Sequence, residues 1–402
     1  MALMTVAEAL QRVLADTPPL PTETVTLDEA LGRVLTEDVI ALRTQPPAAV
    51  SAMDGYAVRA SDVANAPVTL KVIGEVLAGH PFAGKVGPGE AARIFTGGVM
   101  PAGSDTVVIQ ELTTKVISGI IIQKPVALAR NVRAEGIDFA RRQILLRKGR
   151  RLTDRDLMLA AAMNHPRLNV HRQPRVAVLG TGDELVAPGG TPKPGEIVYS
   201  NGFALAALAR SNGGKVHDLG IVHDRIDDIT TAVHRAQEWG ADILVTSGGA
   251  SVGEHDLVQR ALAAEGLELS FWRVALRPGR PMMHGRLGKM QVLGVPGNPV
   301  SSYVCAFLFL VPLMRKLAGR TDIEHLPQSA RLGCDLRAND ERADYLRAII
   351  QGGANSPLAT PLPAQDSSLM TPLAQADCLL IREPYAPAAV AGSDCVILML
   401  GC

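Results

Sequence analysis

Between residues 175 and 310, short apolar runs alternate with segments of helical periodicity, and this alternation constrains the fold more than any other feature of the chain. The apolar runs lie at 175–180, 215–222, 241–249 and 267–276. Strands that alternate with helices of about 10–15 residues predict a doubly wound, mostly parallel sheet. We therefore expect an α/β domain over residues 174–320.

Two other parts of the chain show the pattern of β domains. Residues 45–139 consist of short runs rich in Val and Ile, separated by Gly, Pro and Asp. Residues 321–402 again contain short strands with Pro and Gly turns. Such runs predict β structure, the first as an inserted β domain and the second as a small β-barrel or sandwich.

Helical patterns stand directly before and after the first of these β domains. Residues 1–44 and 140–173 are therefore expected to pack together as one discontinuous helical domain. Its helices are predicted around 6–16, 27–35 and 153–163, and Thr153 is the expected N-cap of the last one because Asp156 occupies the acidic third position.

Composition and charge exclude several classes of protein. Forty basic residues balance forty acidic ones, so the basic surplus expected of a nucleic-acid binder is missing. The first half of the uncharged stretch 291–314 is full of Pro, Gly and Asn, and its apolar part, 303–314, is shorter than the roughly 20 residues of a membrane span, which predicts a buried helix. The five cysteines form no CxxC pair. We expect a soluble, cytoplasmic protein without nucleic-acid or membrane partners.

The loops that follow the predicted parallel strands are the expected ligand sites, because ligands bind at the carboxyl ends of such strands. The segment LGTGDEL (179–185) places Asp183 and Glu184 after a strand, either as metal ligands or as a capped tight turn. The segment TSGGASVGEHD (246–256) supplies hydroxyls and unhindered amides suited to phosphate oxygens, followed by carboxylates suited to Mg²⁺. Neither segment is a P-loop or a GxGxxG motif.

A third group of residues surrounds the predicted start of the last helix. In VPGNPVSS (295–302), Asn298 suits an N-cap and Pro299 a first helical turn, and this N-terminus either faces an anion or only starts a helix. Just upstream, Arg273 and Arg277 are expected on one face of a strand, and Arg280 follows a Pro-Gly turn. Together these arginines either form an oxyanion pocket or are surface charges.

The inserted β domain has polar turns in SAMDGYAV (51–58), RIFTGGVMP (93–101) and NVRAEGIDF (131–139). Taken singly, the polar side chains of these turns read as ordinary turn residues. They are Asp54, Thr96, Arg133 and Asp138.

Taken together, the motifs resemble one family, the molybdopterin molybdenumtransferases, which include MoeA and the E domain of gephyrin. Seven segments match in the family's order, and the resemblance covers essentially the whole chain. They are SAMDGYAV, RIFTGGVMP, NVRAEGIDF, VLGTGDEL, TSGGASVGEHD, RPGRP and VPGNPVSS. The resemblance implies a discontinuous helical domain, an inserted β domain, an α/β domain like that of the molybdopterin adenylyltransferases, and a C-terminal β-barrel.

The resemblance also implies a reaction, namely Mg²⁺-dependent insertion of molybdate into adenylated molybdopterin with release of AMP. It implies a homodimer whose active site is shared between subunits, with the polar turns of the β domain reaching the partner. The implied catalytic residues are Glu184, Asp224, Asp256, Arg273, Arg277, Asp54 and Asp138, of which Glu184, Asp224 and Asp256 are the metal ligands. The implied substrate-binding residues are Thr246, Ser247, Gly248, Gly249, Ser251, Thr96, Arg133, Arg280, Pro296, Asn298, Pro299 and Ser301. Further implied partners are the adenylyltransferase that makes the substrate and the enzymes that receive the cofactor.

The chain departs from the family where lysines are usual, because Arg273, Arg277 and Arg280 stand in those places. Arginine keeps the positive charge but excludes any step that requires a neutral amine. Two alternatives stay open at this point. One is the adenylyltransferase itself, which needs only the α/β domain, and the other is a non-catalytic scaffold such as the receptor-anchoring E domain of gephyrin.

Overall fold

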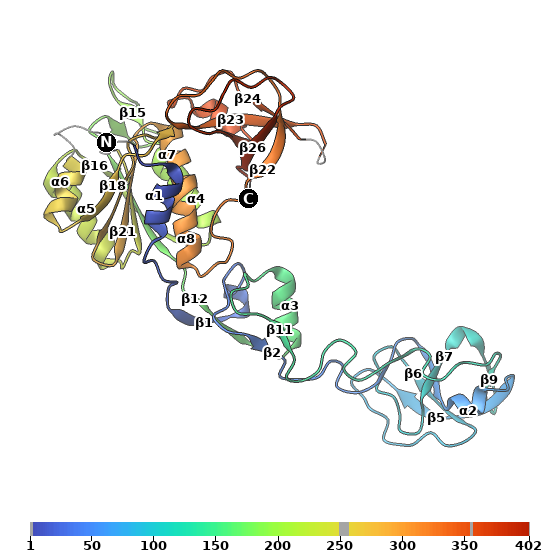
Figure 1. Ribbon diagram of the computed structural model, residues 1–402. Coiled ribbons are helices and arrows are strands. Elements are labelled where there is room, and N and C mark those ends of the chain that lie inside the picture. Colours follow the sequence, from blue (N-terminus) through green and yellow to red (C-terminus); the bar gives the residue numbers. More distant parts are fainter. Residues whose placement is uncertain (1–2, 249–256, 354–356, 402) are drawn as a thin grey trace.

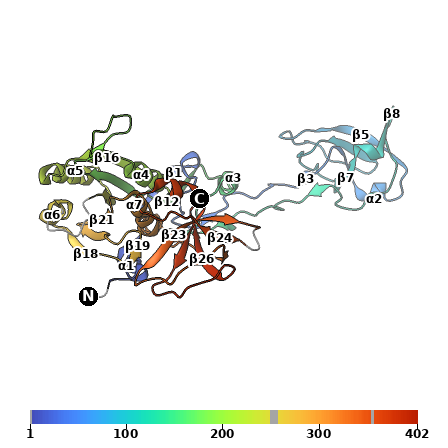
Figure 2. The same ribbon diagram turned by 90° about the horizontal axis from the view of Figure 1, so that it is seen from above.

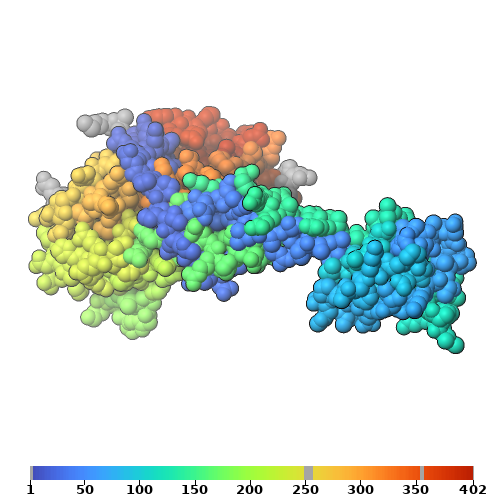
Figure 3. All heavy atoms as spheres, turned by 90° about the horizontal axis from the view of Figure 1, so that it is seen from below, coloured from blue at the N-terminus to red at the C-terminus, as the bar shows by residue number. Residues whose placement is uncertain are grey.

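The chain folds into a broad body and one outlying β domain, which are joined by a narrow stalk made of two segments of the chain (Figures 1 and 2). The computed structural model describes residues 3–248, 257–353 and 357–401. Seen from below, the outlying domain stands clear of the body (Figure 3). The functional site therefore has to be sought in two separate regions.

The body contains the predicted α/β domain, and its mostly parallel sheet is confirmed. The six-stranded sheet has the order β16-β13-β17-β21-β20-β18, in which the first four strands are parallel and β20 runs antiparallel to both of its neighbours, β21 and β18. Its strands are β13 (Arg175–Thr181), β16 (Lys215–Val222), β17 (Ile243–Ser247), β18 (Glu268–Trp272), β20 (Met283–Leu287) and β21 (Met290–Val295). Helices cover both faces, which buries two apolar cores. They are α4 (Asn201–Ser211), α5 (Ile226–Glu238), α6 (Leu257–Ala264) and a long helix made of α7 (Pro299–Cys305), the π-helical η3 (Ala306–Leu310) and α8 (Val311–Leu317).

One predicted strand of this domain is wrong. The run 267–276 was expected as a single strand, but β18 ends at Trp272 and the chain then leaves the sheet. Residues Leu276–Arg277 form β19, which pairs with a strand of the C-terminal domain. The expected shared strand face of Arg273 and Arg277 therefore does not exist, because contacts with another domain draw the second half of the run away.

The long helix Pro299–Leu317 is the apolar segment that was predicted to be buried. It is long and apolar enough to cross a membrane by length and composition, with a mean hydropathy of 1.5, but 83% of that window is buried inside the protein. It packs with α1 (Val6–Leu14) and α4 in the larger of the two cores. This helix is thus a core element of the body.

The discontinuous domain is built from both flanks of the insert. Strand β1 (Thr22–Thr26) pairs with β12 (Arg167–His171), and β2 (Val39–Ile40) pairs with β11 (Ile144–Leu146). Helix α3 (Asp154–Ala162) begins at Thr153 with a capping box, because the Thr153 hydroxyl accepts from Asp156 N–H and the Asp156 carboxylate accepts from Thr153 N–H. The predicted N-cap is confirmed.

The helix predicted at 27–35 is wrong. Only one 3₁₀ turn, η1 (Leu27–Glu29), forms there, and Leu31 is 60% exposed although it was expected on an apolar face. Gly32 follows with φ of +75°, a conformation that ends helical geometry. Helix α1 does not join this domain either, because it packs on the α/β body.

The insert is a β domain, as expected. Its sheet has the order β7-β4-β6-β5-β9-β8. The strands are β4 (Gly55–Val58), β5 (Val68–Val76), β6 (Glu90–Ile94), β7 (Thr106–Ile109), β8 (Thr113–Val116) and β9 (Gly119–Ile122), with the short helices α2 (Ala60–Val63) and η2 (Gln110–Leu112). In the stalk, β3 (Val50–Ser51) pairs with β10 (Val132–Arg133), and Gln45 N–H donates to Phe139 O over 2.9 Å.

The C-terminal domain is a closed barrel, which decides between the two predicted alternatives. It closes because β23 pairs with both β24 and β25. Its strands are β22 (Gln328–Leu332), β23 (Ala343–Gln351), β24 (Leu358–Pro361), β25 (Cys378–Arg382) and β26 (Asp394–Met399), and α9 (Met370–Gln375) lies between β24 and β25. One outer face packs into the same core as the long helix. The four cysteines within the described residues are free thiols.

Candidate active site

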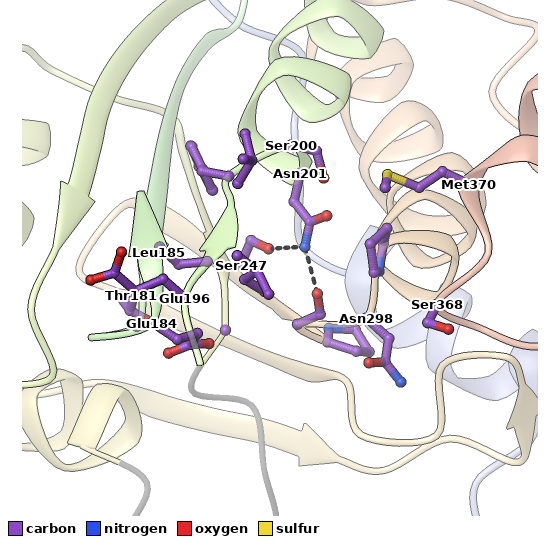
Figure 4. Close-up of a pocket in the computed structure, with 18 of the residues that line it drawn as sticks. Thr181, Glu184, Leu185, Glu196, Ser200, Asn201, Ser247, Asn298, Ser368 and Met370 are labelled. Atoms are coloured by element: carbon purple, nitrogen blue, oxygen red, sulfur yellow. Dashed lines mark hydrogen bonds between the residues drawn. The ribbon is translucent and has the colours of Figure 1, made fainter. Parts of the chain in front are cut away.

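A pocket of about 960 Å³ lies at the carboxyl edge of the parallel sheet (Figure 4). Its floor is formed where β13 and β17 end, and one wall comes from the loop before α7. Ser368 and Met370 of the C-terminal domain form the opposite rim. Nine residues predicted from the sequence line this pocket. They are Glu184, Asp224, Ser247, Gly248, Arg273, Arg280, Pro296, Asn298 and Pro299.

The floor requires the glycine that follows β17. Gly248 has φ of +99°, and a Cβ on it would lie 2.4 Å from the carbonyl oxygen of Thr181. No other residue fits there, because both the backbone conformation and the contact exclude a side chain. Thr246 is fully buried just below, and the hydroxyls of Thr246 and Thr181 have no hydrogen-bond partner in the described part of the chain. Gly249, Ser251 and Asp256, also predicted as site residues, lie outside the described residues.

An acidic wall is formed by the loops after β13 and β16. The Asp183 carboxylate accepts from Asp224 N–H at 3.2 Å and lies 3.1 Å from His223 Nδ1. Burial, and then the negative charges of Asp183 and Glu184, raise the pKa of Asp224 above its ordinary value. The two neighbouring charges thus oppose the ionisation of Asp224, which is the situation that a bound cation relieves.

Two arginines provide the opposite charge. Arg273 and Arg280 both line the pocket and are exposed. Within residues 3–248, 257–353 and 357–401, neither guanidinium has an ion pair or a hydrogen-bond partner. Among the described residues their donors thus face the pocket without a protein partner, which is compatible with the predicted oxyanion pocket.

The structure does not bring Arg277 into this pocket, contrary to the sequence-based expectation. Its Nε donates to Asp344 at 2.6 Å, and its terminal nitrogens contact Asp344, Asp340 at 3.0 Å and Asn339 at 2.9 Å. These hydrogen bonds, that to Asp344 first, raise the pKa of Arg277. Arg277 thus links the α/β body to the barrel, and Asp340 and Asp344 already neutralise its charge.

The start of α7 is partly covered by the C-terminal domain. Asn298 is the N-cap and Pro299 begins the helix, as predicted, but the Asn298 amide donates to Ser367 Oγ at 2.8 Å and does not cap the helix. Val300 N–H donates to Ser367 O at 3.0 Å. Ser301, expected to contact an oxyanion, is only 5% exposed and does not line the pocket. The helix start therefore serves first to hold the domain boundary.

Several pocket residues were missed from the sequence. Tyr199 lies just before α4, and Asn201 is the first residue of this helix. The sequence predicts the helix from residue 203. The signal that could have shown its earlier start is Asn201, because Asn is favoured at helix N-termini. Ser368 and Met370 carry no signal, because only the packing of the barrel brings them to the pocket. Arg347 lies behind them, only 1% exposed, and donates to Asp366 O at 3.2 Å beside Ser368.

The β-domain residues form a second, separate group. Thr96 donates to the Asp54 carboxylate through both its N–H and its hydroxyl, each at 2.8 Å, and these bonds lower the pKa of Asp54. Arg133 lies on β10, and Asp138 adjoins the stalk contact at Phe139. Both are exposed. Figure 1 places this domain at the far end of the molecule from the α/β body, so one chain alone does not bring the two groups together.

Comparison with known proteins matches three consecutive regions of this chain to three regions of molybdopterin biosynthesis proteins. Residues 4–164 match the MoeA N-terminal region (domain I and II), 177–316 a probable molybdopterin binding domain, and 329–400 the MoeA C-terminal region (domain IV). A molybdopterin molybdenumtransferase of Haemophilus influenzae is 34% identical, covering 98% of this chain and 98% of its own. One of Nostoc sp. is 39% identical, covering 74% of this chain and 70% of its own. The molybdopterin biosynthesis MoeA protein of Pyrococcus horikoshii has a TM-score of 0.84 and 31% identity, with 100% of both chains covered.

The fold and these similarities define a transferase of molybdenum cofactor biosynthesis. More particularly, the chain belongs to the molybdopterin molybdenumtransferase family, also called MoeA, which confirms the resemblance seen in the sequence.

Proposed function

We propose that the pocket at the carboxyl edge of the sheet inserts molybdate into adenylated molybdopterin and releases AMP. The observation that carries this proposal is the meeting of opposite charges in one pocket. Glu184 and Asp224 lie in one wall, and the other holds Arg273 and Arg280, which have no ion-pair partner in the part of the chain that the structure describes. An adenylated substrate needs donors for its phosphate oxygens, and molybdate is a dianion that needs cationic side chains. The pocket offers both.

The residues divide the work by their chemistry. The hydroxyl of Ser247 and the open backbone at Gly248 hold phosphate oxygens, which a side chain at position 248 would obstruct. Arg273 and Arg280 bind the oxyanion and hold it toward the pterin. Arg277 supports this wall from behind through Asp344 and makes no direct contact in the proposal.

Mg²⁺ fits the acidic wall. Within the described ranges, no group of three or more His, Cys, Asp or Glu side chains is arranged to hold a metal. Mg²⁺ commonly binds through one or two carboxylates together with substrate phosphates and water, so Glu184 and Asp224 are a sufficient protein contribution. A bound Mg²⁺ supplies charge neutralisation for the phosphate oxygens as AMP leaves. Asp256, the third predicted ligand, is kept as a proposal.

A homodimer gives the polar turns of the β domain a role. Asp54 and Thr96 lie on the β domain, and Arg133 and Asp138 lie on the stalk that carries this domain away from the body of its own chain (Figure 1). We propose that they complete the pocket of a partner subunit, as the isologous contacts of a two-fold dimer allow. The protein would act in the cytoplasm, between the adenylyltransferase that supplies its substrate and the enzymes that receive the cofactor.

The direct test is AMP release from the purified protein given adenylated molybdopterin, Mg²⁺, and either molybdate or tungstate. Release that requires the oxyanion and Mg²⁺ supports the proposal, and the preferred oxyanion identifies the metal. Tight binding of the substrate with no AMP under any of these conditions contradicts it and favours a scaffold on the same fold.

A further inference from the structure

The side chain of Asn201 joins three parts of the pocket floor. It stands at the first residue of α4, and its Nδ2 donates to Ser247 Oγ at 2.8 Å and to Gly297 O at 2.7 Å (Figure 4). Ser247 ends β17, and Gly297 lies in the loop before α7. One amide group therefore fixes the positions of both loops.

The chemistry of Gly297 determines which way this amide faces. A carbonyl oxygen can only accept, so the atom of Asn201 that faces it must be the nitrogen. Both protons of that nitrogen are then used, one toward Gly297 and the other toward Ser247. Ser247 Oγ is consequently an acceptor in this bond, and its own O–H proton is left to point elsewhere.

The Ser247 hydroxyl is the donor that this arrangement leaves for the pocket. Ser247 lines the pocket, and its Oγ has no second hydrogen-bond partner among the described residues. A hydroxyl without an acceptor is suited to an anionic ligand, because it can donate to the ligand's oxygens. The hydroxyl oxygens of Thr181 and Thr246 also have no partner there, but they are buried beneath the floor. The carbonyl of Gly297, which would repel such a ligand, is occupied by Asn201.

We infer that Asn201 is a positioning residue that makes the pocket floor a donor surface for the phosphate oxygens of the adenylated substrate. It does so by holding Ser247 as a donor toward the pocket and by occupying the Gly297 carbonyl. This inference rests on the proposed function, since it takes the substrate to be a phosphate ester bound in this pocket.

The variant Asn201→Asp separates this role from simple structural support. A carboxylate has the same shape but cannot donate to Gly297 O, and it turns the Ser247 proton toward itself. At the N-terminus of α4 a negative charge is favoured by the helix dipole, so α4 itself should persist. Asn212→Asp makes the same change in charge at the opposite end of the same helix and is the control for charge alone. The helix dipole disfavours a negative charge at that end, so the folding of this variant is checked by its unfolding curve.

Binding of ADP, which carries phosphates, is compared with binding of adenosine, which carries none, by calorimetry on the full-length protein. For Asn201→Asp we expect ADP affinity to fall about 10- to 100-fold, the range for losing a hydrogen bond to a charged group, and adenosine affinity to change less than about threefold. Asn212→Asp should leave both unchanged. An equal loss for both ligands would mean structural support only and overturn the inference.

Ser247→Ala provides a second test that does not depend on the folding of Asn201→Asp. It should weaken ADP about tenfold and spare adenosine, and the double variant should lose less than the product of the two single losses, because the residues act through one bond. If Ser247→Ala binds ADP as tightly as the wild type, the inference about Asn201 is overturned and the proposed function is not. A wild-type protein that binds no ADP removes the proposed nucleotide site as well, so the two failures are distinguishable.

Discussion

The edge of the α/β sheet and the outlying β domain both carry polar residues on loops, but it is the first set that lines the pocket of about 960 Å³ among the described residues. At the sheet edge, parallel strands end side by side, so Glu184, Ser247 and Asp224 converge although they are far apart in sequence. In the β domain, Asp54 and Thr96 bond to each other on loops next to the stalk, because Gly97 N–H donates to Ser51 O of β3. Convergence inside one chain follows from its topology, whereas the second group gains its role only in the homodimer that we propose.

The largest effect is expected from the pocket itself. Glu184→Ala should lower AMP release about 100-fold or more, because a charged group placed at the reacting phosphates contributes on that scale. Glu238→Ala, at the exposed end of α5, is the control and should leave the rate unchanged. Substantial activity in Glu184→Ala would remove the acidic wall from the reaction.

Mixing two inactive variants tests whether the two regions meet across subunits. Asp54→Ala and Glu184→Ala should each be inactive alone, yet subunits exchanged between them should regain about a quarter of wild-type activity, since half of the two-fold dimers then hold one intact site. Activity of the mixture is measured after mild unfolding and refolding together. No recovery, with mixed dimers shown to be present, would mean that both groups act within one chain or that the β domain has another role.

A smaller effect is expected at two neighbouring arginines. Arg277 is bound to Asp344, whereas Arg273 lines the pocket and has no ion-pair partner among the described residues. Arg273→Ala should raise the KM for molybdate about tenfold, as expected for a lost charged hydrogen bond, without changing the free energy of unfolding. Arg277→Ala should instead lower the free energy of unfolding by about 1–2 kcal/mol, because Asp344 loses its partner, a cost reduced by solvent around the half-exposed arginine. Chemical denaturation and steady-state kinetics on both variants separate the two results. The reverse pattern would place Arg277 in the pocket.

The smallest effect concerns the pH dependence of the same ion-pair group. Hydrogen bonds from Arg342, and then the charge of Arg277, lower the pKa of Asp340 from 3.8 to about 2. A lowered pKa stabilises the folded state above pH 3.8, and that stability is lost as the pH falls toward 2. Asp340→Asn should therefore cost less than about 1 kcal/mol near neutrality, and its difference from wild type should shrink between pH 4 and pH 2. A difference that is constant over this range would contradict the assignment.

Much of the fold could be predicted because its signals are local. The alternation that predicts the α/β sheet, and the capping box at Thr153, each depend on residues close together in sequence. The break at Trp272 could not be predicted, because Leu276 and Arg277 pair with β23 in another domain. The strands β20 and β21 escape prediction for a different reason. The run that forms β21 leads directly into the loop-like Pro-Gly-Asn-Pro segment, and β20 has the sequence MHGRL, which does not stand out as an apolar run.

The site was predictable to the extent that strand ends mark it. Glu184, Ser247 and Arg280 follow from the order of strands and turns, and all three line the pocket. The diversion of Arg277 to Asp344 and the arrival of Ser368 depend on how the barrel packs against the body. No pattern in the sequence near these residues reports that packing.

The stalk also has a consequence for how the chain folds. The segments β1 and β2 are synthesised before the insert, and their partners β12 and β11 only after it, so the discontinuous domain cannot close until the ribosome has passed both. When the insert folds, its ends meet at Gln45 and Phe139, which replaces a long loop closure by a short one. The folded insert thus holds together the two segments on either side of it. A chain whose insert stays unfolded leaves β1 and β2 without their partner strands, as open edges prone to aggregation.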